Sequence, residues 1–317
     1  MSIFRTVVKI PESNFKIDYN SKMLFIGSCF TENIGNILEE HLFQIQINPF
    51  GIVYNPISIK NSLDFIIANK QFSKQDLQFH NERWFTYHHH SRFSDANQEL
   101  CLEKINNSII SANELFKNAD FLFLTFGTTK VYRKIENQEI VANCHKLPSR
   151  NFTTEILSVE EIVKEFSELF QKLQNFNPNL KIIFTVSPIR HWADGAIQNQ
   201  ISKSTLLLAI NELTSIFQNL YYFPVYEIFM DELRDYRFYA DDMLHPNETA
   251  IKFVFEKFKE TFFEKETEIL FDKINSLNKK IAHRPFNENS LEYKKHLEKI
   301  QFEIDELAKM KIQFRKK

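Results

Sequence analysis

Two short stretches near opposite ends of the chain carry residue types that could perform nucleophilic chemistry. Ser28 follows an apolar run that ends at Gly27, and Asp242 stands three residues before His245. A serine hydroxyl becomes a nucleophile when an imidazole removes its proton, and a carboxylate can hold that imidazole in the required tautomer. These residues therefore predict acyl transfer through a serine, provided that the fold brings the two stretches together.

Each stretch also has an interpretation without chemistry. A serine between a strand and a helix is often only a helix cap, and an acidic loop is often only solvated. For either stretch taken alone, that interpretation is the better one. What favours catalysis is the presence of both in one chain.

The elements expected around Ser28 are a strand, a tight turn and a helix. Residues 23–26 are apolar and predict a buried strand, and residues 31–42 have helical spacing with Thr31 as the N-cap. Gly27 can adopt backbone angles that other residues avoid. The turn would therefore place the Ser28 hydroxyl where a sheet ends and helix amides point outward.

The elements expected around His245 are a loop and a following helix. Pro246 disfavours helical angles at the residue before it, and Asn247 can cap a helix that begins near residue 248. His245 is then held in a loop, where Asp242 can reach its Nδ1 proton. That contact would fix the tautomer and stabilise the imidazolium.

Strands alternate with helices through most of the chain. The expected strands are 23–26, 43–47, 120–126, 181–186 and 221–229, and the expected helices are 31–42, 58–68, 98–119, 158–175 and 199–220. This order predicts an α/β fold, a three-layer α/β/α sandwich with a mainly parallel sheet, and such sheets bind ligands at the carboxyl ends of their strands. The runs 130–134 and 139–143 predict a hairpin beside the sheet.

We expect two parts, an α/β domain at 1–262 and a charged helical extension at 263–317. Within the extension, Leu297, Ile300, Ile304 and Leu307 repeat at coiled-coil spacing over a short length. This seam could pack on the domain, or on another copy to give a homo-oligomer.

Composition excludes several classes of partner. The 317 residues carry 39 basic and 41 acidic side chains, a net charge of -2, which provides no overall field for nucleic acid or an anionic membrane. Three cysteines are not a disulfide framework, the start lacks the apolar core of a signal peptide, and no apolar run has the length of a membrane span. We therefore expect a cytoplasmic protein, and no cofactor is implied.

The Gly-Ser-Cys-Phe at 27–30 and the Asp-Met-Leu-His at 242–245 together resemble the GSCFA family, which is related to the SGNH (GDSL-type) hydrolases. The resemblance covers about residues 20–260. It implies a flavodoxin-like, SGNH hydrolase-like sheet and a catalytic triad, with Ser28 as nucleophile, His245 as base and Asp242 as the residue that orients the base.

The resemblance also implies an oxyanion hole. The nucleophile's own amide at Ser28 and a glycine after the second strand, here Gly51, would be two donors. The asparagine that supplies a third donor in the wider superfamily is replaced by Thr129, and the predicted hairpin brings Asn143 as another candidate. Loss of one such donor costs about 10²–10³ in rate, so these positions bear on whether the site is active.

Further residues of the resembling stretches are expected to border the substrate cleft. These substrate-binding candidates are Gly127, Thr128, His145, Arg190 and His191. No metal site is predicted, since the three consecutive histidines at 88–90 cannot all point one way.

The leading interpretation is a serine-dependent esterase or acyltransferase acting on an O-acyl ester of a carbohydrate or another small molecule. One alternative is a non-catalytic ligand-binding domain that keeps the pocket. The other is a metal- or thiol-dependent enzyme that uses residues from a set of histidines and cysteines, namely His88, His89, His90, His145, Cys29 and Cys144.

Overall fold

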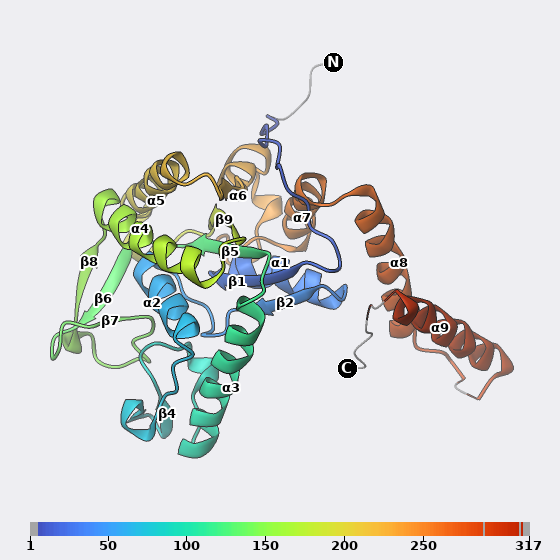
Figure 1. Cartoon of the computed structure of the whole chain (residues 1–317), viewed down its shortest axis with the longest axis horizontal. Helices are drawn as coiled ribbons and strands as arrows, with labels where there is room; N and C mark the ends of the chain where they lie inside the picture. The colour runs from blue at the N-terminus through green and yellow to red at the C-terminus, as the bar shows by residue number, and fades with distance from the viewer. Residues whose placement is uncertain (1–5, 288, 311, 313–317) are drawn as a thin grey trace.

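A five-stranded parallel sheet lies at the centre of the computed structural model, which describes residues 6–287, 289–310 and 312 (Figure 1). Its strands are β1 (Lys22–Gly27), β2 (Gln44–Ile47), β5 (Phe121–Phe126), β9 (Lys181–Val186) and β10 (Leu220–Tyr222). They lie in the order β10-β9-β5-β1-β2, and every neighbouring pair is parallel. This is the 2-1-3-4-5 order of flavodoxin-like folds, so the predicted α/β architecture is confirmed.

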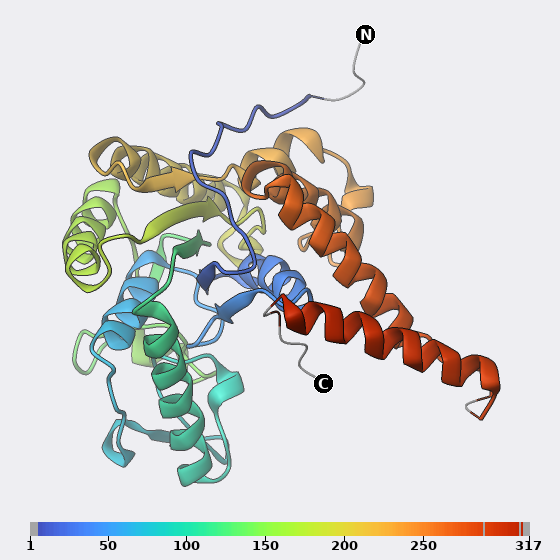
Figure 2. The same ribbon diagram turned by 45° about the vertical axis from the view of Figure 1, so that its right-hand side comes forward.

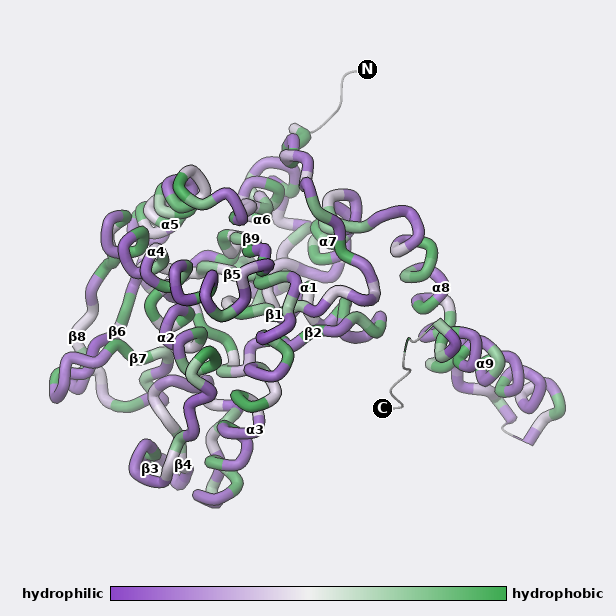
Figure 3. The backbone as a smooth tube through the Cα atoms, viewed as in Figure 1, coloured by the Kyte–Doolittle hydropathy of each residue, from purple (hydrophilic) through white to green (hydrophobic). Residues whose placement is uncertain are grey.

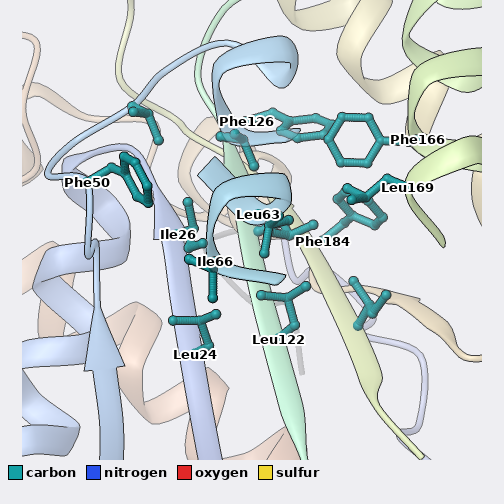
Figure 4. Close-up of a cluster of buried hydrophobic side chains, with 14 of the residues drawn as sticks. Leu24, Ile26, Phe50, Leu63, Ile66, Leu122, Phe126, Phe166, Leu169 and Phe184 are labelled. Carbon is teal, nitrogen blue, oxygen red and sulfur yellow. The ribbon is translucent and has the colours of Figure 1, made fainter. Parts of the chain in front are cut away.

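Helices cover both faces of the sheet. On one face pack α1 (Cys29–Glu40) and α7 (Glu248–Phe262), and on the other pack α2 (Pro56–Ile67), α3 (Gln98–Phe116), α4 (Val159–Phe176) and α5 (Ala196–Ile216). Figure 4 shows the second interface, where Leu24 and Leu122 of the sheet lie beneath Leu63 and Ile66 of α2.

The strands are continuous apolar runs because both of their faces are buried. In β1, Met23 and Phe25 belong to the core under α1 and α7, whereas Leu24 and Ile26 belong to the core under α2 and α3. Burying each such side chain contributes about 1.5–3 kcal/mol. The carboxyl ends of β1, β5 and β9 consequently meet at one edge of a rigid sheet.

Three smaller elements lie outside this sheet. One is a hairpin of β3 (Gln78–His80) and β4 (Arg83–Phe85), in a stretch where the sequence predicts no strand. The predicted hairpin is present as β6 (Lys130–Lys134) and β7 (Ile140–Val141), and an unpredicted strand β8 (Phe152–Ile156) pairs with the other edge of β6. Short helical turns lie at Lys74–Asp76, Ser91–Phe93, Ser149–Asn151, Trp192–Asp194 and Tyr236–Phe238.

Two sequence expectations about element boundaries are wrong. The expected strand 221–229 ends at Tyr222, because Pro224 has no N–H to donate to a sheet; α6 (Val225–Glu227) and a π-helical segment (Ile228–Glu232) follow. Helix α1 begins at Cys29 with Ser28 in the N-cap position, three residues before the expected Thr31.

The C-terminal helices α8 (Lys265–Ala282) and α9 (Leu291–Lys309) project from the α/β body as an arm (Figures 1 and 2). The two helices share a small core, in which Ile300 and Leu307 meet Ile274 and Leu277. Three residues of the predicted seam, Ile300, Ile304 and Leu307, thus pack on α8 of the same chain, whereas Leu297 is exposed. Hydrophilic residues dominate the rest of α9 (Figure 3). Among the described residues, no helix has the length and apolar character needed to cross a bilayer.

Candidate functional site

The loop between the π-helical segment and α7 holds an oriented imidazole. The Nδ1 of His245 lies 2.5 Å from one carboxylate oxygen of Asp242, and the other oxygen accepts the amides of Leu244 and His245 at 2.9 Å each. The hydrogen bonds from the amide and then the side chain of His245 lower the pKa of Asp242 to about 2. An ionised Asp242 holds the proton on Nδ1, which leaves the Nε2 lone pair free to accept a proton.

The Nε2 of His245 faces the other stretch that the sequence singled out, but it contacts a different residue there. It lies 3.9 Å from the Sγ of Cys29, which is 216 positions away in the chain. Ser28 is 1% exposed, and its Oγ has no hydrogen-bond partner among the described residues. The expected contact between His245 and Ser28 is therefore corrected to a contact between His245 and Cys29.

The backbone angles explain why Ser28 is buried whereas the adjacent Cys29 contacts His245. Gly27 has φ +149°, and a Cβ at this position would lie 2.3 Å from the carbonyl oxygen of Thr125 in the neighbouring strand. Ser28 is still extended, with φ -72° and ψ 176°, and its side chain does not cap α1. Cys29 is the first helical residue, and its side chain emerges at the carboxyl edge of the sheet toward the His245 loop.

Cys29 has a mixed electrostatic environment. Burial raises the pKa of its thiol, and Glu32 raises it further, whereas hydrogen bonds from its own amide and from Tyr54 and the charge of Lys203 favour the thiolate. Burial, with the neighbouring Cys29, also raises the pKa of Tyr54 to about 12, so this hydroxyl remains a donor. The thiol thus lies near an imidazole, a phenol and the amino group of Lys203.

Lys203 is a buried lysine that the sequence analysis missed. Its side chain is 0% exposed, and Nζ donates to the carbonyl oxygens of Gly127 at 2.6 Å and Ser187 at 2.7 Å. It therefore ties together the segments that leave β5 and β9. Burial lowers its pKa to about 7. A signal was available, because Lys203 falls on the buried stripe of α5 with Leu206, Ala209 and Ile210.

A second unpredicted group of residues fixes the turn after β1. Asn48 is fully buried with φ +44°, accepts the amide of Gly27 at 2.8 Å and donates to Glu32 at 3.3 Å. Arg92 donates to Glu32 at 2.6 Å. These contacts hold the first turn of α1 against β2.

Three predicted oxyanion donors are already engaged. The Ser28 amide donates to Thr125 O at 3.3 Å, and the Gly51 amide donates to Asn48 O at 2.7 Å. Thr129 is 0% exposed, with its amide 2.8 Å and its hydroxyl 3.1 Å from the Ser202 hydroxyl. Buried amides need partners, and these have found them inside the fold.

The first turn of α1 offers other donors. The leading amides of a helix lack intrahelical acceptors; here the Thr31 amide donates to Ser28 O at 2.9 Å, and the Ser28 side chain does not cap those of Cys29 and Phe30. They carry the positive end of the helix dipole at the residue that His245 contacts. An oxyanion formed on an acyl group at Cys29 would lie beside them.

Of the substrate-binding candidates, His191 and Arg190 lie close to this site. The His191 ring meets Tyr54 edge-on at 5.2 Å between centroids, and burial lowers its pKa to about 4, so the ring is neutral. Arg190 makes no ion pair within the described part of the chain; its Nη2 lies 4.0 Å from the Met230 sulfur.

The remaining candidates have structural contacts. The amides of Gly127 and Thr128 both donate to Tyr54 O, at 2.7 and 3.1 Å. His145 Nε2 donates to Thr86 O at 2.9 Å, and Asn143 Oδ1 accepts the His145 amide at 2.8 Å, so both side chains stabilise their own loop. In residues 6–287, 289–310 and 312, no group of three or more His, Cys, Asp or Glu side chains is placed to hold a metal ion.

Comparison with known proteins gives a family and several structural likenesses. The family model described as GSCFA family matches residues 22–258, and the one described as GSCFA domain protein, C-terminal domain, matches residues 274–317. No curated protein matches the chain.

Two solved structures are similar at low identity. A carbohydrate esterase family 3 protein from Talaromyces cellulolyticus is 11% identical with a TM-score of 0.35, covering 80% of this chain and 99% of that one. An acetyl xylan esterase from the rumen bacterium Butyrivibrio proteoclasticus is 11% identical with a TM-score of 0.38, covering 76% and 64%. Likenesses at these TM-scores carry no functional argument, so the function must be argued from the side chains.

Proposed function

For this chain, which belongs to the GSCFA family, we propose the function of an esterase or acyltransferase that acts on an O-acyl ester of a carbohydrate or another small molecule. The observation that supports it is the oriented imidazole. Asp242 holds Nδ1 of His245, and Nε2 points at the turn between β1 and α1. An imidazole held in this way is the general base that nucleophilic acyl transfer requires.

The surrounding groups fit that reaction. The uncapped amides of α1 supply donors for the oxyanion of a tetrahedral intermediate. Arg190, without an ion-pair partner among the described residues, can bind an anionic or hydroxyl-rich part of the substrate. Water as acceptor makes the protein an esterase, and another hydroxyl as acceptor makes it an acyltransferase.

We also propose a cytoplasmic location. Cys29, Cys101 and Cys144 are all free thiols. Thiols persist in reducing compartments, whereas oxidising ones favour disulfides.

A screen of aryl acetates and acylated sugars against the purified protein tests the enzymatic proposal. We expect turnover that His245→Ala abolishes, and a protein mass increased by one acyl group when the reaction is quenched early. If the wild type hydrolyses none of these esters faster than His245→Ala does, the protein is not an esterase of this kind.

The second candidate function is ligand binding without turnover, which is favoured by the occupied donors at Ser28, Gly51 and Thr129. In that case calorimetry would detect binding of an acylated sugar that is recovered unchanged.

A further inference from the structure

We propose that the nucleophile of this site is the thiol of Cys29 and not the hydroxyl of Ser28, so that the reaction passes through a thioester. The inference rests on the proposed function and specifies its covalent intermediate. It is carried by the geometry of two adjacent residues at the end of β1.

The contact with the base, His245, distinguishes Cys29 from Ser28. The Nε2 of His245 lies 3.9 Å from Cys29 Sγ, within the range of a hydrogen bond to sulfur. Catalytic contacts are often this loose before substrate binds. The Ser28 hydroxyl is 1% exposed and makes no contact with the imidazole, so an ester could not reach it without opening of the turn.

The position of Cys29 in α1 places its thiol beside groups that stabilise a thiolate, although burial raises its pKa. It is the first helical residue, beside amides that Ser28 leaves uncapped. A helix N-terminus and a neighbouring cation both stabilise a thiolate, and here Tyr54 and Lys203 act in the same direction. Burial opposes them and raises the pKa of the thiol, so the proton passes from Cys29 to His245 when the substrate arrives.

Each step of the reaction balances with water as the co-reactant. His245 Nε2 takes the Cys29 proton while Sγ forms a bond to the acyl carbon. The tetrahedral intermediate then breaks its C–O bond, and the leaving alcohol takes the proton from the imidazolium. A water molecule next loses a proton to His245 and attacks the thioester; the C–S bond breaks, and the acid and the free thiol are released.

The thioester has a consequence for the acyl acceptor. Thioesters react with amines and thiols more readily than oxygen esters do. A Cys29 enzyme is therefore suited to pass its acyl group to acceptors other than water, and added amines or thiols should increase the release of the alcohol product.

Trapping of the acyl group tests the assignment. The protein and its variants are mixed with p-nitrophenyl acetate, quenched in acid, and mapped by peptide mass spectrometry. We expect acetyl on Cys29, released by neutral hydroxylamine, in the wild type and in Ser28→Ala. The control Cys144→Ala should keep the adduct, Cys29→Ala should lose it, and Cys29→Ser should carry an oxygen ester that neutral hydroxylamine leaves in place. An adduct on Ser28 that survives Cys29→Ala would overturn the proposal.

Alkylation separates a failure of this inference from a failure of the proposed function. Iodoacetamide should label Cys29 at least tenfold more slowly in His245→Ala than in the wild type, with Cys144 as the internal reference for rate. If this dependence is present but no ester is turned over, the esterase proposal is wrong and the Cys29–His245 pair stands. If Cys29 labels equally fast in both proteins, the pairing is wrong even when esters are hydrolysed. Circular dichroism and thermal unfolding confirm that each variant is folded.

Discussion

Two regions of the molecule are rich in histidine and cysteine, and they use these side chains in opposite ways. The candidate catalytic edge, at the carboxyl ends of β1, β5 and β9, contains Cys29, Tyr54, His191, Lys203 and His245. The histidine cluster, beside β4 and β7, contains His88, His89, His90, Cys144 and His145.

In the histidine cluster the rings are structural. His88 pairs with Glu139 at 3.1 Å, and this contact lowers the pKa of Glu139 to about 2. His145 stacks on Phe85 at 4.0 Å and donates to Thr86 O. Their nitrogens serve to attach β7 and its loop to the β4 segment.

At the candidate catalytic edge one histidine nitrogen remains available. His245 is fixed through Nδ1 by Asp242, and its side chain is 49% exposed, with Nε2 toward a thiol. The residue types do not distinguish the two regions. What distinguishes them is an oriented ring whose second nitrogen meets a reactive group and solvent.

The largest expected effect is at His245. His245→Ala should lower the rate of ester turnover by about 10²–10⁴, the usual contribution of a general base, without lowering the urea midpoint of unfolding. Steady-state kinetics and urea unfolding of the two proteins check this. If His245→Ala lowered the urea midpoint as well as the rate, His245 would be a structural ring like those of the histidine cluster.

An intermediate effect is expected at Arg190. Removing a charged hydrogen bond to the substrate costs about 1.5–3 kcal/mol, so Arg190→Ala should lower kcat/KM roughly 10- to 150-fold for an acidic or sugar ester and spare a small neutral aryl ester. The ratio of the two kcat/KM values measures this. Equal losses on both substrates would make Arg190 a structural residue.

The smallest effect is a pH dependence of stability in the histidine cluster. Burial lowers the pKa of His145 to about 4, below the value of roughly 6.5 in an unfolded chain. Between these values the unfolded chain binds more protons, so stability from His145 is present above pH 6.5 or so and is lost as the pH falls toward 4. The urea midpoint should therefore fall more between pH 7 and pH 5 in the wild type than in His145→Phe. Identical slopes would contradict the burial of this ring.

Local spacing predicted much of the architecture and part of the site. The apolar runs predicted the parallel sheet, and three residues of loop were enough to predict the contact between Asp242 and His245. Which of Ser28 and Cys29 faces His245 depends on the backbone angles at the junction of β1 and α1. Serine and cysteine both tolerate these angles, so the residue types alone could not predict it. Lys203 was missed because a lysine in a helix is usually solvated, although its spacing from Leu206 and Ile210 places it on the apolar stripe of α5.

Because of Gly27, the position of the Cys29 side chain depends on the register between β1 and β5. Because a Cβ there would collide with the Thr125 carbonyl, β1 and β5 run in contact up to the last residue before the turn. A slip of one residue between them would displace Cys29 by about 3.3 Å, as much as the whole separation of reacting atoms in a near-attack complex. The hydrogen-bonded pairing of β1 with β5 therefore determines how closely the Cys29 thiol is aligned with the His245 imidazole, 216 residues away in the chain. The side chains themselves need no adjustment.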